Sequence, residues 1–108
     1  MQKLTKDLYH SKQLDSSSWE VILTDETHPV FKAHFESNPL VPAFLQIDIM
    51  GELLCKKLTQ IDRAKFKLPI LPKDKILYKI VKQNDDKYRI KIFKESREVS
   101  DFRVRYKN

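Results

Sequence analysis

The strongest constraint on the fold is the pair Pro39 and Pro42, which a nearly unbroken apolar stretch follows at once. Each proline lacks a backbone N–H and pushes the preceding residue toward extended backbone, so no helix can run through residues 36–42. Residues 43–58 are apolar on nearly every side, which is typical of a helix enclosed by a sheet or a partner subunit. The sequence therefore predicts a central helix that begins directly after the prolines.

The rest of the chain favours strands. Residues 19–24 are a predicted strand, closed by a turn at 25–29, and a loop with extended pieces leads to Pro42. After the helix, residues 63–68 alternate and should bury Ala64, Phe66 and Leu68. Further strands are predicted at 75–82, 87–94 and 99–106, with a hairpin turn at 83–86. The aromatic residues that should fill the sheet core, or line a tunnel beside it, are Tyr78, Tyr88, Phe93 and Phe102.

This pattern predicts an α+β fold in one domain spanning residues 1–108, with an antiparallel sheet wrapped around one long central helix. The sheet must curl, because a flat sheet would leave much of so apolar a helix in water. With 108 residues the buried fraction of the surface is modest, so a partner subunit would help.

Composition excludes several classes of protein. No apolar run approaches the length of a membrane span, and the N-terminus has no export signal, so we expect a cytoplasmic protein without membrane association. A single cysteine, Cys55, excludes an internal disulfide, and the spacing of the three histidines resembles no zinc site. We expect no metal, and we expect Cys55 to be a packed apolar group and not a nucleophile.

The charge is uneven. Residues 1–55 hold 4 Lys/Arg and 8 Asp/Glu, whereas residues 56–108 hold 17 and 7. A basic half attracts acidic partners, and both nucleic acid and acidic carrier proteins would respond to it. A plainer interpretation is that the lysines and arginines form the solvated face of the C-terminal strands and protect their edges.

The chemistry-bearing residues are His34 and Asp48, a base before the prolines and an acid inside the apolar helix. Desolvation should raise the pKa of Asp48 toward a range in which it can deliver a proton. The alternatives are a hydrogen-bonded structural histidine and a solvated stripe of Asp48, Glu52 and Lys56 at four-residue spacing. His28, before Pro29, is expected to be a turn residue.

Two blocks of sequence resemble a known family. His34-Phe35, Pro39, Pro42 and a carboxylate fourteen positions after the histidine are similar to the signature of the hot-dog-fold 3-hydroxyacyl-acyl-carrier-protein dehydratases. Residues 62–74, with Pro69 and Pro72, resemble the block that follows the central helix in that family. The resemblance implies a sheet wrapped around a helix and a homodimer, or a dimer-based oligomer, whose sheets join edge to edge.

The resemblance also implies roles for residues. His34 would remove a proton from C2 of a 3-hydroxyacyl thioester, and Asp48 of the partner subunit would protonate the departing C3 hydroxyl. Backbone N–H groups at the helix start, beside the substrate-binding residues Pro42, Ala43 and Phe44, would stabilise the enolate-like oxygen. The substrate would be carried by acyl carrier protein or coenzyme A in fatty-acid or polyketide-like lipid synthesis, and no cofactor is implied.

The chain departs from the family pattern where glycines are usual, because it has Glu36-Ser37 after His34-Phe35 and Ala43 after Pro42. Glycine allows backbone angles and a close ligand approach that serine and alanine restrict. The alternatives are therefore a hot-dog thioesterase and a non-catalytic module that binds acyl groups or carrier proteins. Nucleic-acid binding lacks a recognisable motif and is not expected.

Overall fold

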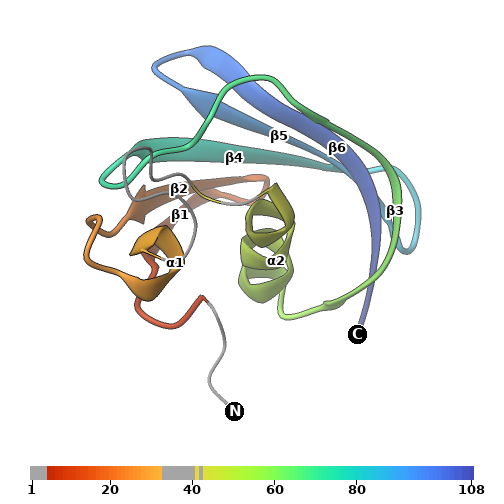
Figure 1. Cartoon of the computed structure of the whole chain (residues 1–108). Coiled ribbons are helices and arrows are strands. Elements are labelled where there is room, and N and C mark those ends of the chain that lie inside the picture. The colour runs from red at the N-terminus through yellow and green to blue at the C-terminus, as the bar shows by residue number, and fades with distance from the viewer. Residues whose placement is uncertain (1–4, 33–40, 42) are drawn as a thin grey trace.

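The computed structural model describes residues 5–32, 41 and 43–108. These residues form one antiparallel sheet with strand order β1-β2-β4-β5-β6-β3 and two helices (Figure 1). The strands are β1 (Tyr9–Asp15), β2 (Ser18–Leu23), β3 (Lys57–Phe66), β4 (Lys75–Lys82), β5 (Lys87–Lys94) and β6 (Arg97–Lys107), and the helices are α1 (Pro29–Lys32) and α2 (Ala43–Leu54). Neither described helix is long and apolar enough to cross a membrane.

The sheet curves around α2, which lies on its concave side (Figure 1). Strands β4, β5 and β6 alternate buried and less buried residues, so one face of each strand packs toward the helix. The core joins these strands to apolar residues of α2, including Leu45, Ile47, Ile49 and Met50. The predicted sheet wrapped around a helix is thus found, and β4 and β5 have the predicted bounds.

Three buried hydrogen bonds fix α2 against the sheet. The Tyr78 hydroxyl donates to the carbonyl of Gln46 at 2.9 Å, and the Tyr106 hydroxyl donates to the carbonyl of Ile47 at 2.8 Å. The Ser100 hydroxyl donates to the side-chain oxygen of Gln46 at 2.6 Å. Because buried polar groups without partners are costly, these bonds set both the height and the rotation of the helix.

The expectation of a long helix over residues 43–58 is wrong, because α2 has 12 residues and ends at Leu54. Cys55 takes a left-handed conformation with φ of 55°. The N–H of Lys56 returns to the carbonyl of Gly51 at 3.0 Å, and the N–H of Cys55 to that of Glu52 at 3.1 Å. This is a Schellman ending, which usually has glycine where this chain has cysteine.

Two elements were not expected from the sequence. Strand β1 pairs with β2 at one edge of the sheet and is exposed over nearly its whole length, so it has no apolar alternation to reveal it. Helix α1 is a single turn in the segment expected to be a loop. The His28 ring caps it, because its Nδ1 accepts the N–H of Val30 at 3.1 Å. The interpretation of His28 as a turn residue is confirmed.

The opposite edge strand, β3, starts earlier than expected and is exposed along its whole length. The expected burial of Ala64, Phe66 and Leu68 is wrong for the single chain, since Phe66 keeps 39% and Leu68 37% of its surface exposed. The register pairs Ala64 with Phe102 and Phe66 with Ser100, both fully buried, so these side chains point to the concave face. That face of β3 is apolar, and the described residues leave it partly exposed.

Candidate active site

Asp48 lies in the second turn of α2, and its side chain is exposed in the single chain. Neighbouring atoms nevertheless remove part of the hydration of its carboxyl group, and this desolvation raises the pKa of Asp48; the negative charge of Glu52 raises it further. The predicted direction of the shift is confirmed. A carboxyl group with a raised pKa is better suited to donate a proton than an ordinary surface aspartate.

The start of α2 presents Ala43 and Phe44 to solvent, with Phe44 51% exposed. Phe44 and Asp48 are four residues apart, so they lie on the same face of the helix. Just before the helix, Val41 is buried, and its N–H donates to the carbonyl of Ile70 at 2.7 Å. This bond ties the entry of α2 to the segment that contains Pro69 and Pro72, so two blocks that are distant in sequence meet beside the helix.

His34 and Pro42 lie outside the described residues. The approach of His34 to Asp48 therefore stays a prediction. Of the five predicted site residues, Ala43, Phe44 and Asp48 are described, and all three lie on the exposed part of α2.

Glu52 joins a hydrogen-bond network that the sequence did not reveal. Its Oε1 accepts the Tyr9 hydroxyl at 2.8 Å, and its Oε2 accepts the hydroxyl of Thr5. Burial and the bond to Glu52 raise the pKa of Tyr9. A solvated stripe of Asp48, Glu52 and Lys56 is not formed, because Glu52 binds the N-terminal segment and the Lys56 ammonium lies 5.9 Å from the centre of the Tyr88 ring.

The four-residue spacing of Asp48 and Glu52 was the only sequence signal for this network. Thr5 and Tyr9 gave none, because they precede the first predicted strand and their approach to α2 depends on the tertiary fold. The network fixes a negative charge one helical turn from Asp48. Since like charges disfavour ionisation, Glu52 supports the protonated form of Asp48.

Tyr106 connects the candidate acid to the sheet. Burial raises the pKa of Tyr106, and the charge of Asp48 raises it further. Its hydroxyl is bonded to the carbonyl of Ile47, the residue before Asp48. The backbone that carries Asp48 is therefore anchored to the sheet, while the carboxyl group remains accessible.

Cys55 does not have the expected packed position, because its side chain is exposed at the end of α2. The reversal of the chain at the helix end turns it away from the core. Among the described residues, no group of three or more histidine, cysteine, aspartate or glutamate side chains could hold a metal ion.

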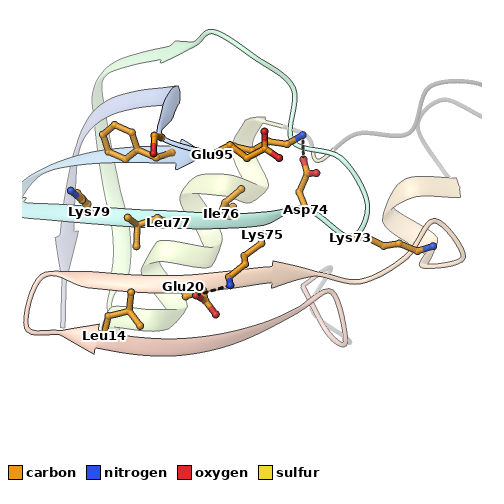
Figure 2. Close-up of a pocket in the computed structure, with 12 residues that line it drawn as sticks. Leu14, Glu20, Lys73, Asp74, Lys75, Ile76, Leu77, Lys79 and Glu95 are labelled. Atoms are coloured by element: carbon orange, nitrogen blue, oxygen red, sulfur yellow. Dashed lines mark ion pairs between the residues drawn. The ribbon is translucent and has the colours of Figure 1, made fainter.

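A wide hollow lies on the other face of the sheet, with α2 behind the strands (Figure 2). It measures about 760 Å³, and Leu14, Leu77 and Phe93 supply apolar surface. The assignment of Phe93 to the core is thus wrong, because Phe93 pairs with Leu77 on the convex face. Two lysine charges at the rim of the hollow are neutralised by ion pairs, that of Lys75 by Glu20 at 3.4 Å and that of Lys94 by Asp74 at 2.8 Å.

Comparisons with known proteins agree with this architecture. The model of a family described as ApeI-like, ApeI dehydratase, matches residues 10–103. The dehydratase heterocomplex ApeI:P from Xenorhabdus doucetiae has a chain with a TM-score of 0.74 and 21% identity, covering 92% of this chain and 95% of that one. A comparison with curated protein sequences finds no match.

Two further solved structures share the fold. An uncharacterized protein from Erwinia carotovora subsp. atroseptica has a TM-score of 0.61 at 21% identity, with 91% of this chain and 90% of that chain covered. The PaaI protein of the phenylacetic acid degradation operon of E. coli has a TM-score of 0.64 at 12% identity, with 97% and 87% covered. The antiparallel six-stranded sheet with its helix is thus a hot-dog fold.

Proposed function

The chain belongs to the ApeI-like dehydratase family, and on that premise we propose that it removes water from 3-hydroxyacyl thioesters to give trans-2-enoyl thioesters. The observation that carries the proposal is the family match over residues 10–103, together with the raised pKa of Asp48 at the exposed face of α2. The proposed substrates are acyl groups on acyl carrier protein or coenzyme A, used in fatty-acid or polyketide-like lipid synthesis.

In the proposed reaction His34 takes the proton from C2 of the substrate. The electrons of the broken C2–H bond form the C2=C3 double bond, and the C3–O bond breaks as Asp48 protonates the leaving hydroxyl, so that water departs. Negative charge develops on the thioester oxygen during this step. N–H groups of the first turn of α2, beside Pro42, Ala43 and Phe44, would stabilise it with the help of the helix dipole.

The proposed active unit is a dimer in which the base and the acid come from different copies. Strand β3 supports this arrangement, because it is an edge strand whose backbone groups are open to pairing. Its concave-facing residues Leu58, Ile61 and Phe66 are respectively 37%, 48% and 39% exposed. A second copy paired along β3 would cover this apolar surface with its own helix and sheet.

The decisive experiment follows the absorbance of the conjugated thioester with crotonyl-type and 3-hydroxybutyryl-type substrates. We expect His34→Ala and Asp48→Asn each to abolish the interconversion. His10→Ala and Asp85→Asn are matched controls, because both residues are exposed and neither side chain makes a described hydrogen bond or ion pair. Wild-type rates in both site variants would refute the assignment, and release of free thiol without enoyl formation would indicate a thioesterase.

A mixing experiment tests whether the site is shared between subunits. If His34 of one copy acts with Asp48 of the other, a dimer of one His34→Ala and one Asp48→Asn chain keeps one intact site. Unfolding and refolding an equal mixture of the two inactive variants should then restore about a quarter of the wild-type activity, since half of the dimers are mixed and each has one of two sites. No recovery in a mixture shown to contain mixed dimers would exclude a shared site.

A further inference from the structure

Cationic side chains gather on the convex face of the sheet, away from α2 and Asp48. The register places Arg89 of β5 directly opposite Arg103 of β6, and Arg103 directly opposite Arg63 of β3. Residues directly opposite on neighbouring strands point to the same face, with Cβ atoms about 5 Å apart. Three guanidinium groups therefore form one row across three strands, which we call the arginine row.

The cations around the arginine row differ in how they are neutralised. Arg89 makes a bidentate pair with Asp101, with N···O distances of 3.0 and 3.3 Å. Lys67 is paired with Glu98. By contrast, within the described part of the chain Arg63, Arg103 and the adjacent Lys65 make no side-chain ion pair or hydrogen bond.

This contrast matters because like charges directly opposite each other destabilise a sheet. The rim lysines of the wide hollow show the usual solution, since Lys75 is paired with Glu20 (Figure 2). Lys94 is likewise paired with Asp74. The arginine row lacks enough carboxylates for the same solution, because Asp101 is the only acidic residue among the described residues that line this part of the face. An anion from solution would supply the missing charge.

The arginine row also borders a hollow of a size that suits such an anion. The hollow measures about 120 Å³, and its lining residues are Arg63, Lys65, Lys67, Arg89, Asp101, Phe102 and Arg103. The lining has five cationic groups and one anionic group. A space of this size holds one tetrahedral phosphoryl group, either a free phosphate or one end of pyrophosphate, but not a nucleoside or an acyl chain.

We propose that this hollow is a binding site for a phosphoryl group, held by Arg63 and Arg103 with Lys65 at its side. The guanidinium fork matches two oxygens of a phosphate, and phosphate supplies enough oxygens for two arginines and a lysine together. A dianion also neutralises two cations at once, which a carboxylate does not. The site lies across the sheet from Asp48, so it binds a ligand other than the substrate group undergoing reaction and does not depend on the proposed function.

The test measures binding of pyrophosphate and inorganic phosphate to the intact chain by titration calorimetry at low and physiological salt. We expect Arg63→Ala and Arg103→Ala each to weaken pyrophosphate binding about tenfold, the loss of one charge-assisted contact. Arg97→Ala is the matched control, because Arg97 is an exposed arginine at the start of β6 with no described ion pair and removes the same charge. It should change binding less than about twofold.

Vesicles containing phosphatidic acid, compared with vesicles of neutral lipid, separate a free phosphate ligand from a lipid headgroup. Binding of either phosphate source that depends on Arg63 and Arg103 supports the site. Equal weakening by all three substitutions would overturn it, because only general charge attraction would then remain. Arginine-dependent binding of an arbitrary duplex much tighter than that of pyrophosphate would overturn it in favour of a nucleic-acid surface.

Discussion

Replacing Gly51 with alanine tests how closely α2 packs on the sheet. Gly51 is buried in the third turn of α2, and an added Cβ would lie 3.2 Å from Cε1 of Tyr106 and 3.3 Å from the carbonyl oxygen of Lys56. Both distances are shorter than ordinary van der Waals contact. Neither neighbour can move freely, because Tyr106 is bonded to Ile47 and Lys56 belongs to the Schellman ending.

Two opposing contributions decide whether Gly51→Ala raises or lowers the free energy of unfolding. In a solvent-exposed helix, Gly→Ala adds about 1 kcal/mol of stability through backbone entropy. Overpacking a tight interior costs about 1–3 kcal/mol, since the tyrosine or the helix must shift. The expected result for Gly51→Ala is thus a fall of about 1 kcal/mol in the free energy of unfolding.

The assay is equilibrium urea unfolding at one fixed protomer concentration, with wild type, Gly51→Ala, Tyr106→Leu and the double variant. In the Tyr106→Leu background the aromatic ring is gone and only the contact with the carbonyl oxygen of Lys56 remains, so Gly51→Ala should be less destabilising than in the wild type, with a coupling energy of about 1–2 kcal/mol. If Gly51→Ala stabilises both backgrounds equally by about 1 kcal/mol, the close approach of helix and strand is refuted.

Three other outcomes are expected. Cys55→Gly should stabilise the protein by about 0.5–1 kcal/mol in urea unfolding, because φ of 55° strains cysteine but not glycine, whereas Cys55→Ala should change little. Tyr9→Phe should cost about 1 kcal/mol by removing a donor from Glu52, and thermal unfolding would show no change if that bond were absent. The pKa of Asp48 is raised in the folded protein, so protonation of its carboxyl group favours the folded state. As pH rises through the range in which carboxyl groups titrate, the wild type should therefore lose stability relative to Asp48→Asn. If the free energies of unfolding of the two proteins changed in parallel with pH, the shift would be contradicted.

The sequence predicted the middle of the fold better than its edges. Strands β4 and β5 were located residue by residue, because each has apolar residues at every second position, and these residues are buried on the face toward α2. Strand β1 was missed and β3 was shortened, since edge strands exposed on both faces need no alternation. Backbone hydrogen bonds to a neighbouring strand hold these edge strands in place. Because every residue has the same backbone groups, the residue types of an edge strand do not show which strand it pairs with.

For the site, the sequence predicted the direction of the Asp48 pKa shift but not all of its causes. Desolvation by apolar neighbours follows from the local sequence, and Glu52 is only four residues away. The anchoring of Glu52 by Thr5 and Tyr9 joins residues more than forty positions apart, with separations of 47 and 43. No periodicity reports such a contact.

The sequence by itself determined where the helix begins and which strands form the core, because proline geometry and apolar alternation act over a few residues. Only the tertiary structure decided where α2 ends, which edge of the sheet stays apolar and open, and which cations stand in one row. Those features depend on the register between strands far apart in the chain, and a shift of one residue would turn the arginine row toward the core.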